Sequence, residues 1–225
     1  MRSLTAKALG RVAKRLIYLA VLLFVPARTI RFPQGWVLLT IFLMAELLVW
    51  VYLLKQNPEL LQRRLKGGLF AEGRVSQKII ILAMNFCFTL IVVVPALDHR
   101  YHWSHVPTWL TVIADAGVLL GFLLQFYTLK ENTFASAVVA IVPEQRVIST
   151  GPYAAVRHPM YAGSLLVHFC TSLALGSLWG LPVALGSLVA ISLRLLDEEK
   201  LLRQSLPGYE EYRRKVQSRL IPGVW

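Results

Sequence analysis

Acidic side chains, cysteines and glycine-rich motifs are all scarce in this sequence. It has 12 Asp and Glu residues against 24 Lys and Arg. The two cysteines, Cys87 and Cys170, form no C-x-x-C pair, so the ligand spacing of a zinc site is absent and no metal is expected. No glycine-rich dinucleotide loop is present either. These absences argue against a metal centre and against a dinucleotide-binding Rossmann fold.

Hydrophobic residues, by contrast, are abundant. They make up 56% of the 225 residues, and the mean hydropathy is +0.57, whereas soluble domains contain about 45–50% apolar residues. Several segments approach the ~20 residues that cross a bilayer as a helix. The sequence therefore predicts an all-α, multi-pass integral membrane protein.

Apolar runs separated by charged loops predict about six transmembrane helices. The first, near Leu16–Ile30, is short and follows a basic segment, as the core of a signal peptide would, but no A-x-A-like cleavage site follows it. We therefore interpret it as a first, short membrane helix. The next three predicted spans are Gly35–Leu54, Ile79–Leu97 and Thr108–Leu129.

The C-terminal third predicts a helical hairpin and then an amphipathic helix. Residues 160–196 are apolar apart from GSLWGLP at 176–182, whose glycine and proline indicate a turn between two short helices. Small residues, Gly163 among them, would let these two helices pack closely. Beyond them, apolar residues recur every three or four positions. This predicts an amphipathic helix at the cytosolic face, lying on the membrane and broken at Pro207-Gly208.

Charge distribution sets the expected orientation. The basic residues cluster in the N-terminal lead-in, in loops 55–78 and 130–158, and in the C-terminal segment. Six spans place these clusters and both termini on one side, and the positive-inside rule makes that side cytoplasmic. The net charge of +12 then reflects topology and attraction to anionic membrane lipids rather than nucleic-acid binding. We expect N-terminal transmembrane helices over residues 1–130 and a functional core over 131–225.

Two polar blocks flank the predicted hairpin. The first, TGPYAAVRHPMYAG, begins at Thr150 and contains a Gly-Pro turn, then Arg157 and His158, then Pro159 at a favourable first helical position. The free backbone N–H groups of the new helix favour an anion there. The alternative is that Arg157 contacts lipid phosphate and His158 only caps the helix.

The second block, RLLDEEKLL, follows the hairpin. Arg194 and Glu198 are four residues apart and share a helix face, and Glu199 makes a carboxylate pair with Glu198. Taken alone, these residues favour juxtamembrane ion pairs, Arg194–Glu198 and Glu199–Arg203. Because a hairpin brings its ends together, however, we expect the two blocks to face each other at one cytoplasmic mouth. Such a site would bind a ligand that carries charges of both signs.

Together the two blocks resemble the isoprenylcysteine carboxyl methyltransferase family and its bacterial relatives, which are related to the phospholipid methyltransferases. The resemblance covers about Asn132–Trp225 and implies a methyltransferase core over 131–225 that binds S-adenosylmethionine and releases S-adenosylhomocysteine. It implies that Arg194 is the catalytic, substrate-binding arginine, and we expect Arg157 and Glu199 to support the site. The implied cofactor-binding residues are Gln145, Arg146, Val147 and Ile148 of a strand-like QRVI segment, together with Tyr153, His158, Pro159, Met160, Tyr161 and Glu198.

The resemblance implies carboxyl O-methylation of a lipophilic, prenylcysteine-like or prenylated substrate that enters from the bilayer. Arg194 favours this, since guanidinium binds carboxylate through two parallel hydrogen bonds, and an ionised carboxylate requires no general base. Two alternatives stay open. One is a phospholipid or small-lipid N-methyltransferase, and the other is a non-enzymatic membrane protein or transporter.

One departure from the family and three other polar residues need interpretation. Where eukaryotic members have a cofactor-binding glutamine, this chain has Val138 or Val139. Glu46 and Asp115 lie within predicted spans but outside the matching motifs. We interpret them as interhelical hydrogen-bonding groups, although ionisable residues at that depth are often functional. His168 is interpreted as a packed histidine.

Overall fold

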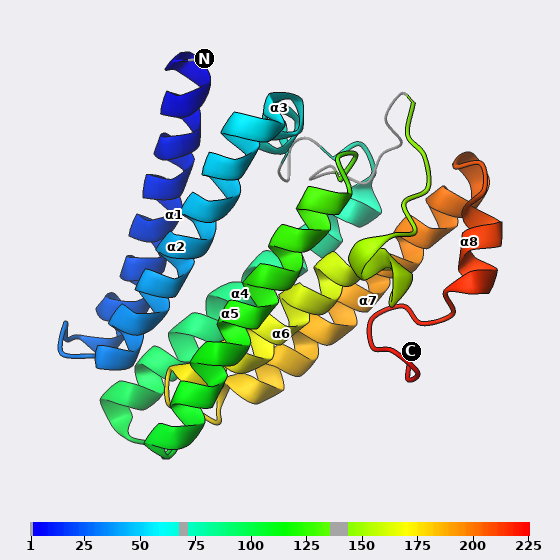
Figure 1. The fold of residues 1–225 in the computed structure, drawn as a ribbon. Coiled ribbons are helices and arrows are strands. Elements are labelled where there is room, and N and C mark those ends of the chain that lie inside the picture. The colour runs from blue at the N-terminus through cyan, green and yellow to red at the C-terminus, as the bar shows by residue number, and fades with distance from the viewer. Residues whose placement is uncertain (1, 68–71, 136–143) are drawn as a thin grey trace.

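The computed structural model describes residues 2–67, 72–135 and 144–225 (Figure 1). All regular structure in these ranges is helical, which confirms the all-α prediction. The elements are α1 (Arg2–Ala27), α2 (Pro33–Gln56), α3 (Pro58–Lys66), α4 (Val75–Tyr101), α5 (Thr108–Glu131), the 3₁₀ turn η2 (Gly151–Ala154), α6 (Pro159–Ala174), α7 (Gly180–Ser205) and α8 (Tyr209–Lys215).

Four of the described helices, α2, α4, α5 and α7, are long and apolar enough to cross a membrane. The other two predicted spans are also helical. Helix α1 begins at Arg2, well before the predicted Leu16, and carries Lys and Arg residues along its first half. Helix α6 has 16 residues, and at ~1.5 Å per residue it is about 24 Å long, shorter than the ~30 Å hydrocarbon layer. We therefore treat the chain as a multi-pass membrane protein in which α1 and α6 complete the bundle.

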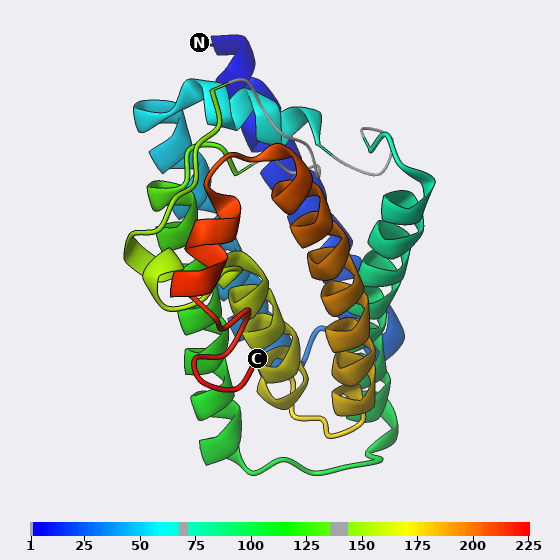
Figure 2. The same cartoon turned by 90° about the vertical axis from the view of Figure 1, so that its right-hand side faces the viewer.

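The helices form one bundle in which successive long helices run in opposite directions (Figures 1 and 2). Helix α1 pairs with α2, α5 lies along α6, and α4 lies along α7. Residues 175–179 join α6 to α7, so the predicted hairpin is present. The short helix α3 lies at the end of the bundle where the N-terminus is found (Figure 1).

One predicted contact has a different partner. Gly163 approaches Gly121 of α5 rather than its hairpin neighbour α7. A Cβ atom on Gly163 would lie 2.7 Å from Gly121 O, and a Cβ atom on Gly121 would lie 2.8 Å from Gly163 O. Only a residue without a side chain allows backbones to come this close. The expectation that Gly163 closes the hairpin is therefore wrong, because this glycine joins α6 to α5.

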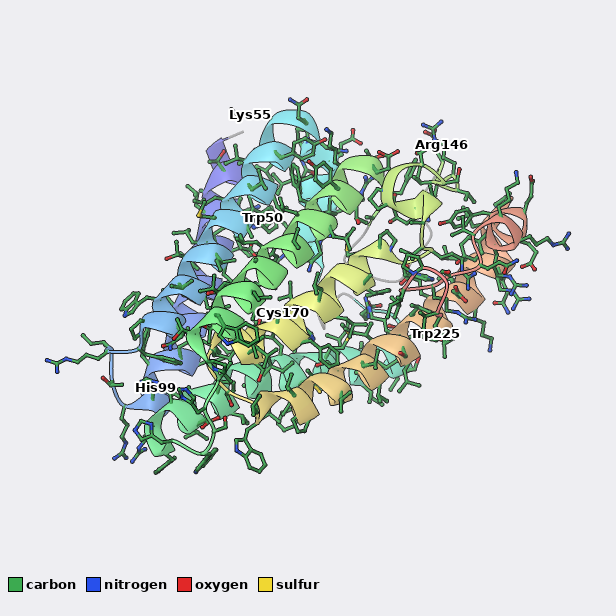
Figure 3. The ribbon with its side chains drawn as sticks, turned by 60° about the horizontal axis from the view of Figure 1, so that its bottom comes forward. Trp50, Lys55, His99, Arg146, Cys170 and Trp225 are labelled. Atoms are coloured by element: carbon green, nitrogen blue, oxygen red, sulfur yellow. The ribbon has the colours of Figure 1, made fainter. Side chains whose placement is uncertain are left out.

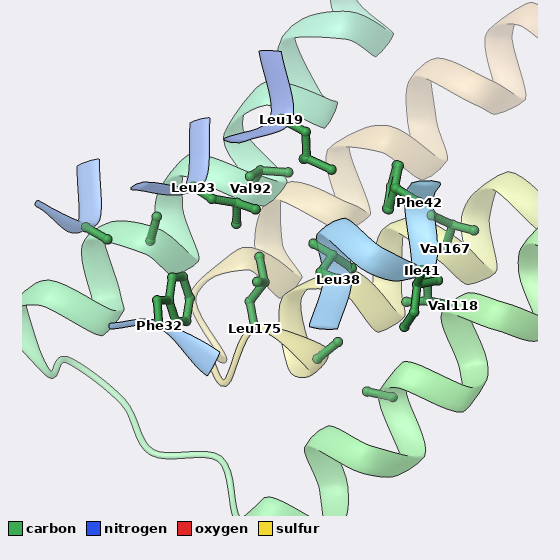
Figure 4. Packing of buried hydrophobic residues seen from close by; sticks show 14 residues of the cluster. Leu19, Leu23, Phe32, Leu38, Ile41, Phe42, Val92, Val118, Val167 and Leu175 are labelled. Carbon is green, nitrogen blue, oxygen red and sulfur yellow. The ribbon is translucent and has the colours of Figure 1, made fainter. Parts of the chain in front are cut away.

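A hydrophobic core ties α1 and α2 to the rest of the bundle (Figure 4). Leu19 and Leu23 of α1, Leu38 of α2 and Val92 of α4 are almost fully buried, and so is Phe32, which precedes α2. Large apolar side chains stay exposed on the outside of the helices. Continuous apolar surface of this kind is expected where lipid tails replace water.

Charged residues distinguish the two ends of the bundle. Lys55 and Arg146 lie toward the end that carries α3, whereas His99 lies toward the opposite end (Figure 3). At that opposite end, Asp98 accepts hydrogen bonds of 2.5 Å from Ser104 Oγ and from Ser177 Oγ. Asp98 thereby ties the α4–α5 connection to the hairpin turn, at the end of the bundle opposite Lys55 and Arg146.

Helix α8 does not have the predicted environment. Leu206, Tyr209 and Tyr212 were expected to face lipid, but they are buried beside Val147 and Tyr153 of the loop before α6. Tyr212 Oη also donates a hydrogen bond of 2.8 Å to Tyr153 O. The amphipathic pattern correctly predicts an apolar face, and that face packs on protein because the adjacent loop supplies an apolar surface. The predicted break before α8 is present, with α7 ending at Ser205.

Candidate active site

The two polar blocks lie against each other. Helix α6 begins at Pro159, and Glu198 and Glu199 lie toward the end of α7, beside that first turn (Figure 2). Tyr161 Oη donates a hydrogen bond of 2.6 Å to Glu198 Oε2, and His158 Nε2 lies 3.1 Å from Glu199 Oε1. The His158 side chain caps no backbone N–H of α6. The hairpin therefore brings together residues that are about forty positions apart in the chain.

Glu199 is a buried carboxylate that holds the C-terminal segment. Its Oε1 accepts a hydrogen bond of 2.7 Å from Arg157 Nε, and its Oε2 accepts one of 3.1 Å from Arg219 Nε. Arg157 Nη1 also donates to Val216 O at 2.9 Å and to Gln217 O at 2.8 Å. Because Arg157 is buried among these protein groups, it does not meet lipid phosphate. Glu199 forms ion pairs with Arg157 and Arg219 rather than with Arg203.

Arg194 is held by three side chains. Its Nε donates to Tyr161 Oη at 3.1 Å, its Nη1 to Gln77 Oε1 at 2.8 Å and its Nη2 to Glu72 Oε1 at 3.1 Å. The Tyr161 hydroxyl thus bridges Arg194 to Glu198, in place of a direct ion pair between the two. Glu72 and Gln77 come from the start of α4 and the segment before it, and no motif in their local sequence indicates this role.

Tyr161, Arg194 and Glu198 border a cavity of about 430 Å³. This volume is within the usual range of about 300–1,000 Å³ for small-molecule sites. Glu198 supplies a negative charge to its wall, and several arginines supply positive charges. Of the residues predicted from the sequence, Pro159 and Glu199 are not on the wall. Those that do line it are Gln145, Arg146, Val147, Ile148, Tyr153, Arg157, His158, Met160, Tyr161, Arg194 and Glu198.

The loop before α6 borders the cavity without forming a strand. Segment 145–148 was expected to be strand-like, but it has no regular structure, and the described residues include no neighbouring strand to pair with it. Asn132 Nδ2 donates to Tyr153 Oη at 2.9 Å. Burial raises the pKa of Tyr153 to about 12, so its phenol stays neutral at physiological pH. The Val138–Val139 pair lies outside the described residues.

Several cavity residues come from parts of the chain that the sequence analysis left outside the site. They include Arg15 of α1, Arg64 of α3 and Gln125 of α5. Both arginines belong to basic segments beside apolar spans. In the sequence, these basic segments are interpreted as determinants of membrane topology and not as part of a site. Their convergence depends on how α1, α3 and α5 pack, which no local pattern indicates.

A second cavity of about 270 Å³ adjoins the first, and most of its remaining wall is apolar or aromatic. The residues that line both cavities are Arg15, Arg64, Met84, Gln125 and Ser164. Glu46 borders the second cavity and accepts hydrogen bonds from Arg15 of α1 and from Trp50 Nε1, so the predicted interhelical bond of Glu46 is present. Asp115 Oδ1 has no hydrogen-bond partner among the described residues, in contrast to the prediction, and His168 Nδ1 has none there either.

A family model of phospholipid methyltransferases matches residues 109–207. The match runs from the beginning of α5 to just beyond α7 and contains both polar blocks. This part of the chain is similar to the phospholipid methyltransferases. The resemblance to this group of membrane methyltransferases is thereby confirmed. A search of curated proteins finds no match to the chain.

The limits of the match show what the rest of the chain contributes to the candidate site. The matched range is a little under half of the 225 residues. Arg15 and Arg64, which line the cavity, lie outside it, as do Glu72 and Gln77, which hold Arg194. The N-terminal helices therefore form part of the candidate site as well as part of the membrane domain.

Proposed function

We propose that this protein transfers a methyl group from S-adenosylmethionine to the carboxyl group of a lipophilic, prenylcysteine-like acceptor at the cytoplasmic face of a membrane. The observation that carries the proposal is the cavity in which Tyr161 links Arg194 to Glu198. In this cavity, Arg194 and Glu198 offer charges of both signs. A carboxylate acceptor and a methyl donor with charges of both signs would each meet an opposite charge there. The cytoplasmic placement follows from the basic loops at this end of the bundle.

The residues around the cavity fit S-adenosylmethionine in size and charge. When bound, this cofactor supplies a methyl group activated by a sulfonium. Glu198 offers a carboxylate to its cationic groups, and Tyr153 offers an aromatic ring with a neutral hydroxyl. The backbone of 145–148 and the first turn of α6, His158–Tyr161, complete the set that would hold it. This fit supports the cofactor-binding residues predicted from the sequence, and S-adenosylhomocysteine would be the product.

The chain's own residues would bind and orient the acceptor rather than remove a proton from it, because a carboxylate is already ionised near neutral pH. We assign carboxylate binding to Arg194, whose guanidinium suits two parallel hydrogen bonds. Since Glu72 contacts the same guanidinium, an acceptor carboxylate would share or displace that contact. Helix α8, with Tyr209 and Tyr212 on the cavity wall, would exclude water from the aligned reactants.

Cofactor binding tests the proposal directly. S-adenosylhomocysteine should raise the Tm of the purified protein in mild detergent, because a ligand that binds only the folded state stabilises it. Glu198→Gln should weaken that binding by about tenfold or more, given ~1.5–3 kcal/mol for a hydrogen bond to a charged group. Glu210→Gln is the matched control, since Glu210 is a carboxylate of α8 that does not line the cavity. A wild-type protein that S-adenosylhomocysteine does not stabilise would favour a non-enzymatic membrane protein.

The family match supports a second candidate, N-methylation of a phospholipid or other small lipid. The two candidates differ in the bond that receives the methyl group. Membranes containing the protein can be incubated with methyl-labelled S-adenosylmethionine and the lipid product treated with mild base. Release of the label as volatile methanol indicates a methyl ester and the carboxyl acceptor, whereas label that stays in a non-volatile product indicates an amine acceptor.

A further inference from the structure

Arg64 carries a positive charge that forms no ion pair with a carboxylate of the described residues, although Glu46 is near enough to raise its pKa. No ion pair joins it to any described residue, and its side chain makes one long hydrogen bond, from Nη1 to Ala135 O at 3.4 Å. The residues outside the described ranges contain no Asp or Glu. A partly buried cation is costly unless an anion completes its environment.

The surrounding charges add to this positive excess. Arg11 Nη1 donates to Arg64 O at 2.8 Å, and Arg15 forms an ion pair with Glu46. Arg11 and Arg15 are thus near enough to Arg64 to lower its pKa, and the Glu46 carboxylate, which Trp50 also contacts, acts in the opposite direction. Burial, and then Arg15, lower the pKa of Arg64 to about 10, so this arginine is still protonated at neutral pH.

The position of Arg64 indicates which ligand it would meet. Arg64 and Arg15 line both cavities, whereas Glu198 and Arg194 line only the first. A group bound at Arg64 would therefore lie at the junction between the charged cavity and the mainly apolar one. Arg194 and Arg157 on the same wall already have carboxylate partners, whereas Arg64 forms no ion pair with a described residue.

We propose that Arg64, with Arg15 beside it, is an anion-binding subsite for an acidic group that an amphiphilic acceptor carries besides the carboxylate assigned to Arg194, and that the apolar part of this acceptor occupies the second cavity. The inference rests on the proposed function and narrows its acceptor to anionic amphiphiles, with a carboxylate or a phosphate as the acid. Helices α1 and α3 supply the two arginines, and both lie outside the range that matches the phospholipid methyltransferases.

Simple amphiphiles test the subsite with the full-length protein in non-ionic detergent. Dodecanoate or dodecyl phosphate should raise the Tm of the wild type, and dodecanol should raise it much less. The stronger of the two acids identifies the source of the anion as a carboxylate or a phosphate headgroup. Inorganic phosphate alone should have little effect, and stabilisation by it equal to that by dodecyl phosphate would overturn the subsite by showing non-specific anion binding.

Variants separate this subsite from the cofactor site. Arg64→Gln should lose about tenfold or more in affinity for the stronger acid and keep its affinity for S-adenosylhomocysteine. Arg63→Gln is the matched control, because Arg63 is the neighbouring arginine of α3 and lines neither cavity. Arg64→Lys keeps the charge and should keep most of the affinity for the acid.

Two further results would overturn the subsite. One is equal stabilisation of the wild type by dodecanol and by the acids, which needs no variant and therefore decides the matter even if Arg64→Gln does not fold. The other is a loss of S-adenosylhomocysteine affinity in Arg64→Gln as large as the loss for the acid, which would assign Arg64 to the cofactor carboxylate. A wild type that does not bind S-adenosylhomocysteine would instead overturn the proposed function.

Discussion

Glu198 and Glu199 are adjacent residues with different surroundings. Glu199 is buried against Arg157 and His158 and does not reach the cavity. Glu198 lies on the cavity wall and accepts a hydrogen bond from Tyr161. One step along a helix turns the side chain by about 100°, which is enough to separate a structural carboxylate from one that can meet a ligand. The sequence shows the pair but does not indicate which member faces the ligand.

Arg194→Ala tests the residue assigned to the acceptor. We expect a loss of about 10- to 100-fold in kcat/KM for a prenylcysteine acceptor, corresponding to ~1.5–3 kcal/mol for a charge-assisted hydrogen bond. Affinity for S-adenosylhomocysteine should change much less. The measurement combines initial rates at varied acceptor concentration with a ligand-induced shift in Tm.

Arg203→Ala is the control for this substitution, since Arg203 lies on the same helix, is exposed and pairs with Glu210. It should leave both quantities near those of the wild type. Equal losses of acceptor use and cofactor binding in Arg194→Ala would contradict the assignment and make Arg194 a residue that only positions Tyr161 and Glu198.

At the scale of helices, the approach of α5 to α6 is decided by two glycines. Gly163→Ala would place a Cβ atom 2.7 Å from Gly121 O and 3.0 Å from Gln125 Cγ. The first of these contacts is with backbone, so the helices must move apart, and overpacking of this kind costs about 1–3 kcal/mol. We expect a lower Tm for this variant in the same detergent.

Gly10→Ala provides the opposite control. No atom lies within 4 Å of a Cβ built on Gly10, which is an exposed position of α1. Alanine favours a helix over glycine by about 1 kcal/mol, so this variant should melt at or above the wild-type temperature. If Gly163→Ala melts as high as the wild type, the close contact between α5 and α6 is not present in the folded protein.

Helix α8 illustrates a limit of periodicity. An apolar stripe shows that one face of a helix is to be buried, but lipid and protein both satisfy it. In this chain Leu206 and Tyr209 pack on the loop that borders the cavity. The same apolar stripe therefore packs on protein and lines part of the cavity wall.

At the scale of the whole molecule, the basic loops and the cavity share one end of the bundle, and this predicts their side of the membrane. Cysteine can be introduced at Lys55, Arg146 or His105 after Cys87 and Cys170 are replaced. All three target positions are exposed, and Lys55 and Arg146 lie toward the end opposite His99 (Figure 3). In sealed vesicles of known orientation, an impermeant maleimide should label the first two only from the cytoplasmic side and His105→Cys only from the other. Labelling of Lys55→Cys and Arg146→Cys from opposite sides would contradict the topology.

The cavity is a property of the whole bundle rather than of the C-terminal half. Its wall takes residues from α1, α3, α4, α5, α6, α7 and α8. The sequence analysis placed the site within 131–225, because both polar blocks are there. Arg15 and Arg64 reach it only because α1 and α3 pack at the same end of the bundle.

Local sequence by itself determined the helices, the hairpin and the two polar blocks, because hydrophobic length, turn residues and fixed spacing act over neighbouring positions. It also indicated that Arg194 and Glu198 share a helix face. The tertiary structure decided which groups those residues meet: Glu72 and Gln77 on Arg194, Arg64 at the junction of the cavities, and α5 rather than α7 beside Gly163. These contacts depend on the rotation and depth of each helix against its neighbours. Many packings bury the same apolar stripes, so only the folded bundle selects among them.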